Sequence, residues 1–145
     1  MDISSLIVSE KVVKAEYPDP AFEGFTVELC YLARAEIQKI RTKCISMVYS
    51  KKTHKPEEKL DDDLFLKLYV SKVIKGWEGL TAGYLADLMP IDISAIDVNT
   101  AIDFTEANAL SLMQNSVEFD SWVSGVVSDL ALFNKNSLSK KEKTS

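Results

Sequence analysis

The sequence predicts an α+β fold that is mostly helical, with an N-terminal β-hairpin packed on a bundle of four or five helices. Three observations support this: an alternating segment near the N-terminus, longer runs with apolar residues every three or four positions, and an apolar content of 46%. The chain of 145 residues is long enough for one hydrophobic core. We expect a single domain over residues 1–134 and a disordered basic tail over residues 135–145.

Two extended segments come first in the chain. Lys11–Tyr17 and Phe25–Leu32 are rich in β-branched and aromatic residues, and the second alternates apolar with polar positions. The segment between them, PDPAFEG, supplies two prolines and a glycine, which are typical of a turn. Two strands alone are only marginally stable, so we expect this hairpin to lie on helices.

The next segment changes its period. Apolar residues in Ala33–Tyr49 recur at helical spacing, and the opposite face carries Arg34, Lys39, Arg41 and Lys43. The following ten residues, SKKTHKPEEK, predict an exposed loop that is broken at Pro56.

The run LDDDLFLKLYVSKVIKGW, residues 60–77, predicts a stronger helix. Asp61 or Asp62 can cap it, and its apolar stripe ends at Trp77. Gly76 and Gly79 would let the chain stop and turn there. Two interpretations of Trp77 follow: it closes the buried face of the helix, or it is a partly exposed anchor for a binding partner.

The remaining chain predicts three more helices. A short one, Leu80–Leu88, must end before Pro90, and residues 90–104 are expected to form an ordered loop packed by isoleucines. Thr105 caps the helix TEANALSLMQ, and Ser116 caps a last helix that runs to Phe133.

No pattern of reactive residues predicts catalysis or metal binding. The chain has no nucleotide-binding glycine motif, no zinc or calcium motif and a single histidine, His54. Cys30 and Cys44 are isolated and are expected to be reduced, partly buried thiols. Residues 61–63 are three consecutive aspartates, which suit a helix start better than a metal site. We therefore expect no enzyme activity and no cofactor, although 22 acidic residues leave a paired-carboxylate hydrolase open.

The net charge of −5 is unevenly distributed. Residues 34–59 hold eight basic and three acidic residues, whereas residues 76–134 hold nine acidic ones and no Lys, Arg or His. An acidic half of this size repels phosphate backbones, so nucleic acid is not an expected partner. A small DNA-binding regulator would need a basic recognition helix, which only Ala33–Tyr49 offers. No apolar run is long enough for a membrane span, and the acidic N-terminal residues do not suit a secretory signal, so we expect a cytoplasmic protein without a membrane partner.

The order of several motifs resembles a known family. FEGF at residues 22–25, GWEGL at 76–80, DFTEANA at 103–109 and FDSWV at 119–123 follow one another as in the small tail assembly chaperones of long-tailed bacteriophages. The resemblance covers roughly residues 22–134, and it depends on the order and spacing of the motifs.

This resemblance implies a specific role. Such chaperones bind the long helical tape-measure protein, and often the tail-tube subunit, and keep both soluble until the tube polymerises. They act in the host cytoplasm and are not part of the finished virion. Many are made in two lengths by programmed ribosomal frameshifting, which a protein sequence does not reveal. The resemblance and the charge split are also consistent with self-association.

We expect the apolar stripes that end at Trp77 and Trp122 to lie mostly in the core. Their exposed margins and the acidic C-terminal half are the expected partner surface. A helical client could dock there by helix-in-groove contacts. An alternative function is a structural tail or head-completion protein that is incorporated in the virion. The candidate partner-binding residues are Trp77, Leu80, Tyr84, Phe119, Trp122 and Phe133.

Overall fold

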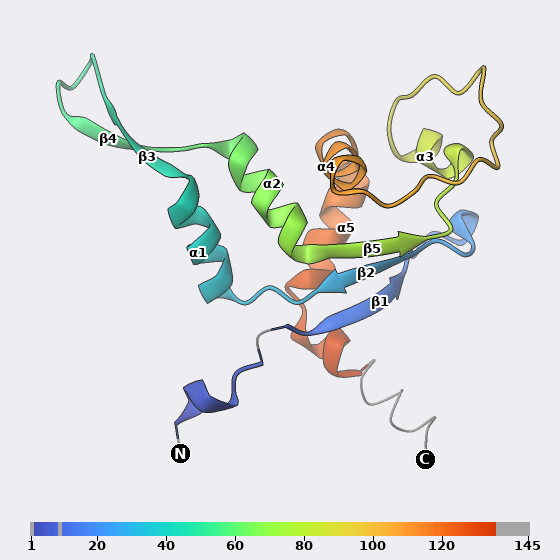
Figure 1. Ribbon diagram of the computed structural model, residues 1–145, viewed down its shortest axis with the longest axis horizontal. Coiled ribbons are helices and arrows are strands. Elements are labelled where there is room, and N and C mark those ends of the chain that lie inside the picture. The colour runs from blue at the N-terminus through green and yellow to red at the C-terminus, as the bar shows by residue number, and fades with distance from the viewer. Residues whose placement is uncertain (1, 9, 136–145) are drawn as a thin grey trace.

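The centre of the molecule is a three-stranded antiparallel sheet. In the computed structural model, which describes residues 2–8 and 10–135, the strand order is β1-β2-β5 (Figure 1). Strands β1 and β2 pair antiparallel, with Val13 opposite Leu29, which confirms the predicted hairpin. The strands are β1 (Val12–Glu16), β2 (Thr26–Cys30) and β5 (Ile74–Glu78), and a short 3₁₀ turn (Ile3–Leu6) precedes them.

The third strand corrects the prediction that one helix runs through Trp77. Helix α2 (Asp62–Val73) ends earlier, and β5 pairs with β2 so that Trp77 lies opposite Val27. Ile74 and Trp77 face the core, and Gly76 between them is a poor helix former. The free edge of β2 offers hydrogen-bond partners that a further helical turn would not use. The irregular register between Glu28 and Leu29 lets both apolar side chains of β5 point inward.

A second hairpin replaces the end of the first predicted helix and the predicted loop after it. Helix α1 (Arg34–Cys44) stops at Cys44, and β3 (Ile45–Tyr49) pairs antiparallel with β4 (Pro56–Leu60). Three of the five residues in this strand, Ile45, Val48 and Tyr49, are β-branched or aromatic and favour a strand once a pairing partner is present. Both prediction errors have this cause, because a helical stripe and a short strand look alike over five residues.

Three helices cover the sheet. Helix α4 (Glu106–Asn115) contacts α2 on one side and α5 (Val117–Val127) on the other, and α2 and α5 contact β2. The predicted caps are confirmed. Asp61, Thr105 and Ser116 each accept a hydrogen bond from the backbone N–H three residues on, at 3.0–3.1 Å. The last predicted helix is interrupted after Val127, and helical structure resumes at residues 130–135.

The long loop after α3 (Ala82–Leu88) is ordered, as predicted. Ile102 N–H donates to Leu80 O (2.8 Å), and Gly83 N–H donates to Val98 O (2.9 Å). Ile102 packs on the core, but Ile96 is 49% exposed, so only part of the loop is held by isoleucines. Figure 1 shows this loop at the opposite end of the molecule from the β3–β4 hairpin.

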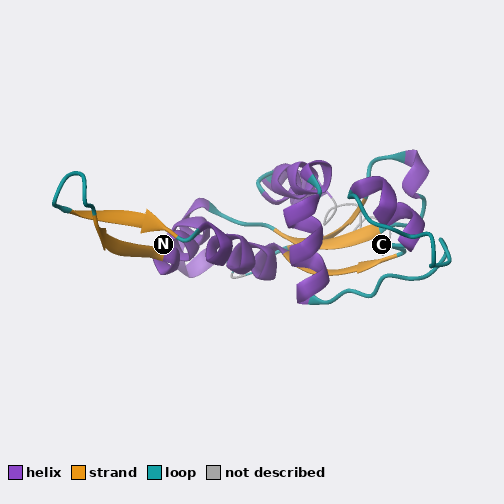
Figure 2. Ribbon diagram, turned by 90° about the horizontal axis from the view of Figure 1, so that it is seen from above, coloured by secondary structure: helices purple, strands orange, loops and turns teal. Residues whose placement is uncertain are grey.

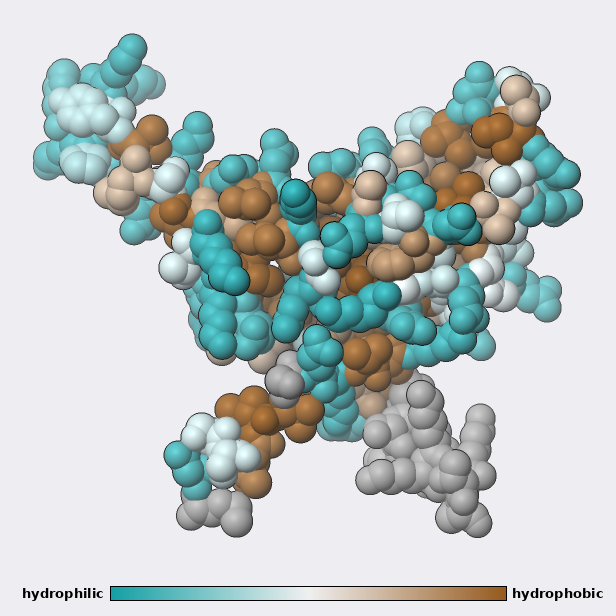
Figure 3. Space-filling view, in the orientation of Figure 1, coloured by the Kyte–Doolittle hydropathy of each residue, from teal (hydrophilic) through white to brown (hydrophobic). Residues whose placement is uncertain are grey.

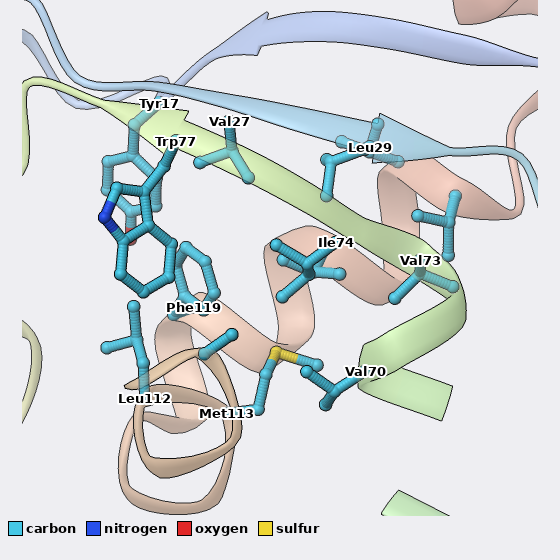
Figure 4. Packing of buried hydrophobic residues seen from close by; sticks show 14 of the residues in the cluster. Tyr17, Val27, Leu29, Val70, Val73, Ile74, Trp77, Leu112, Met113 and Phe119 are labelled. Carbon is cyan, nitrogen blue, oxygen red and sulfur yellow. The ribbon is translucent and has the colours of Figure 1, made fainter. Parts of the chain in front are cut away.

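The fold class is α+β and mostly helical, as the sequence predicts. The core lies between the sheet and the three helices, and Figure 4 shows Val27, Leu29 and Trp77 pointing from the strands towards Met113, Leu112 and Phe119. The predicted tail begins at Lys135, and residues 136–145 lie outside the described part of the chain. Within that described part, no helix has both the length and the apolar character to cross a bilayer.

Candidate functional site

Most of the residues predicted to bind a partner are core residues. Leu80, Phe119 and Phe133 are at most 2% exposed, and Trp77 is 9% exposed. The Trp77 indole Nε1 donates to Ile102 O at 2.9 Å, so Trp77 ties the long loop to the sheet. These four side chains therefore expose little or none of their surface in this structure.

The other two predicted residues lie at the margin of the core. Tyr84 donates its hydroxyl to Glu23 O (2.9 Å), and its ring lies 5.1 Å from the Phe22 ring. Trp122 is half-buried, 5.0 Å from the Tyr17 ring and 5.9 Å from the Phe119 ring. The structure thus joins Phe119 and Trp122 in one aromatic cluster, in which Tyr17 is also a member.

The most exposed run of apolar side chains in a strand lies on the β3–β4 hairpin. We call residues 45–60 the arm; Figures 1 and 2 show it extending from the end of α1 away from the rest of the protein. Met47 is 63% exposed, Val48 43% and Tyr49 64%. The apolar pattern in this stretch was predicted, but it was attributed to a helix.

The arm has one predominantly apolar face. Alternate residues of a strand point to the same side, so Ile45, Met47 and Tyr49 share a face. Their partners across the ladder are Leu60, Glu58 and Pro56, which lie on that same face. Ile45 and Leu60 are half-buried at the base of the arm, whereas Met47 and Tyr49 are exposed further along it. Figure 3 shows this order, with hydrophobic residues lower on the arm and hydrophilic ones at its tip.

The tip and the adjacent helix are basic. Lys51, Lys52, Lys55 and Lys59 are exposed, and within the described residues none of them forms a salt bridge. On α1, Arg34 and Lys43 are likewise exposed and without a salt-bridge partner, whereas Lys39 pairs with Glu36 at 3.2 Å. The basic residues without a salt bridge therefore remain available to an acidic partner.

The one histidine lies at the tip of the arm. His54 has a backbone φ of 55°, and its Nδ1 lies 3.3 Å from the Tyr49 hydroxyl. This contact orders the turn, because it joins the turn to the last residue of β3. Among the described residues, no three His, Cys, Asp or Glu side chains gather closely enough to hold a metal ion.

A groove of about 560 Å³ lies between α2 and α4. Leu68, Ile74, Phe104 and Leu110 form much of its lining, with Lys67 and Glu106 among its polar residues. It can accept an apolar side chain, but its lining contains no hydrogen-bonded cluster of titratable groups.

Tyr17 has a perturbed pKa at the edge of the core. The Tyr17 hydroxyl donates a hydrogen bond to the Glu118 carboxylate at 2.7 Å. Burial and, second, this carboxylate raise the pKa of Tyr17 above its ordinary value of 10.0. Glu118 itself is exposed, so this pair connects β1 with the start of α5 at the edge of the core. It is a structural contact between two elements.

A comparison with known protein families assigns the chain to one of them. The family model described as YdaY prophage protein matches residues 33–144, which is most of the sequence. The chain belongs to this prophage family. It is therefore a phage-derived protein, and the matched region starts at α1 and includes the arm, α2, β5, α3, α4 and α5. No curated protein and no solved structure matches it.

Proposed function

We propose that this YdaY-family chain is a tail assembly chaperone, which binds the tape-measure protein of its phage and keeps it soluble until the tail tube polymerises. The observation that carries the proposal is the arm: a projecting element with exposed apolar and unpaired basic side chains, in a protein of phage origin. Exposed apolar residues on a projecting hairpin are typical of a protein-binding surface.

The motifs of the resemblance support the proposal at the level of the fold. GWEGL forms the end of β5 and the turn at Gly79, DFTEANA provides the cap of α4, and FDSWV lies within α5. Each motif occupies a position on which the core depends. The motifs that carry the resemblance to phage tail assembly chaperones therefore lie at positions that determine the architecture of this chain.

The proposed role has consequences for location and assembly. The protein acts in the host cytoplasm, engages the tape-measure protein and in some phages the tail-tube subunit, and is absent from the mature virion. Weak contacts repeated along a long client add avidity. A longer form made by frameshifting belongs to the same proposal.

The test is co-expression of this protein with the long, helix-rich tape-measure protein of the same prophage. The client is expected in the soluble fraction and in a complex with this protein; alone, it aggregates. An equally insoluble client with and without this protein would contradict the proposal. Mass spectrometry of purified virions distinguishes the alternative, since a structural tail or head-completion protein would be present there.

A further inference from the structure

The arm has features that its own chain does not explain. A two-stranded hairpin is only marginally stable in water, and exposed apolar side chains make it less favourable. Yet Met47 and Tyr49 are both more than 60% exposed on one face. Resting on the proposed function, we infer that the arm is the client-binding element, and that the client stretch it holds carries acidic side chains beside apolar ones.

The apolar face sets the first requirement on the client. Met47 and Tyr49 are two positions apart in a strand, so they lie about 7 Å apart along it. Met adapts to partners of varied shape, and Tyr supplies a large, stiff contact area at interfaces. A client segment with apolar residues at a matching spacing would cover both side chains.

The charges set the second requirement. Lys51, Lys52 and Lys55 surround the tip, and Glu58 is the acidic residue on the apolar face, opposite Met47. Acidic client residues would therefore face the tip, and apolar ones the middle of the arm. The acidic residues 76–134 include α3, α4 and α5, which occupy the middle of the molecule and the end opposite the arm (Figure 1). They would repel such a segment and favour its approach to the arm.

The strand edges favour a polypeptide over a nucleic acid. The small sheet contains only β3 and β4, so each strand has an outer edge that no other strand of the described chain pairs with. An extended segment can add to such an edge through backbone hydrogen bonds. A nucleic acid would neutralise the lysines but would leave Met47 and both edges unused.

The experiment measures how much of the co-expressed tape-measure protein co-purifies with arm variants and with matched controls. Lys51→Glu/Lys55→Glu reverses the charge of the tip, and Met47→Ser/Tyr49→Ser removes the two exposed large side chains of the apolar face. The controls are Lys67→Glu/Lys72→Glu on α2, with the same change in net charge, and Ile96→Ser/Val98→Ser on the opposite loop. We expect a loss of about tenfold or more for each arm variant, and wild-type binding for each control.

The outcomes separate the two proposals. If the wild-type protein does not bind the client, both proposals fall. If it binds and the arm variants bind equally well, the proposed function stands and the arm is not the client site. Circular dichroism confirms that each variant is folded, which is expected because Met47, Tyr49, Lys51 and Lys55 lie outside the core.

Three further measurements address the nature of the occupant. Among client fragments, the one retained by the protein should be net acidic, and retention of a basic fragment would overturn the inference. Light scattering measures whether the arm binds a second copy of this protein. If the arm variants no longer self-associate but still bind the client, the arm binds another copy and the inference is wrong. A gel shift with labelled duplex DNA tests nucleic acid, and retardation that depends on Lys51 and Lys55, with client binding intact, would also overturn it.

Discussion

At the scale of single residues, two glycines determine how the sheet meets the turn after β5. Gly79 has a φ of +77°, and a Cβ at this position would overlap the backbone oxygen of Gly24, which itself has a φ of +83°. The sequence suggested that glycine next to Trp77 gives the chain freedom to turn. The structure adds that two segments distant in sequence approach so closely here that a side chain cannot fit.

The substitution Gly79→Ala should therefore destabilise the protein strongly. Alanine is unfavourable in the left-handed backbone conformation, and its Cβ would overlap a backbone atom. We therefore expect the free energy of unfolding to fall by at least about 3 kcal/mol. Gly125→Ala is the matched control, because Gly125 lies inside α5 with nothing within 4 Å of its added Cβ. It should gain about 1 kcal/mol from helix propensity. Urea unfolding measures both, and equal effects would contradict the close approach at Gly79.

Tyr17 gives the protein a defined sensitivity to alkaline pH. Its pKa is raised in the folded state, by burial first and by Glu118 second, so above pH 10.0 the folded protein keeps a proton that the unfolded chain has lost. The stability from this group is complete below pH 10.0 and falls as the pH rises towards the folded-state pKa.

The variant Tyr17→Phe should flatten this dependence. Between about pH 9 and about pH 11, we expect the wild-type protein to lose more unfolding free energy than the variant. Tyr49→Phe is the control, since Tyr49 is 64% exposed and lies on the arm, and it should follow the wild-type curve. Parallel curves for wild type and Tyr17→Phe would show that this hydroxyl does not contribute.

At the scale of elements, helices were easier to predict than strands. The starts of α2, α4 and α5 were predicted from their capping residues, because a cap acts within one turn of the chain. The ends of α1 and α2 were placed too late, since β3 and β5 follow them directly. A strand needs a partner distant in sequence, and the local pattern of apolar residues does not contain it.

The outer part of the arm, residues 47–58, contributes no buried residue to the core. We expect that replacing residues 47–58 by Asn-Gly, which joins the paired residues Ser46 and Lys59 by a tight turn, changes the unfolding free energy by less than about 1 kcal/mol. The same variant should fail to bind the client. Thermal unfolding followed by circular dichroism measures the first effect. A cooperative collapse of stability would instead show that the hairpin supports α1 and α2.

At the scale of the whole molecule, the fold extends beyond the region shared with the family. The family match begins at residue 33, but β1 and β2 precede it and supply two of the three strands of the sheet. Phe25, Val27 and Leu29 are at most 1% exposed, and burying each such side chain contributes about 1.5–3 kcal/mol.

A fragment of residues 33–145 should consequently be unfolded. It leaves β5 without a partner strand and exposes the inner faces of α2 and α5 to water. A fragment of residues 10–135, which keeps every strand, should unfold cooperatively near the temperature of the full chain. Circular dichroism and heat-capacity measurements compare the two fragments. Cooperative unfolding of the fragment 33–145 would contradict the prediction that residues 1–134 form one domain.

The sequence by itself determined the fold class, the first hairpin, the helix caps and the uneven charge. These features depend on contacts within a few residues, or on composition alone. Only the tertiary structure decided that Trp77 and Phe119 are buried, that five residues after each of two helices become strands, and that Met47 and Tyr49 are exposed. The reason is physical. An apolar stripe indicates side chains that are more stable when buried, but whether the same chain or another protein buries them depends on how distant segments pack.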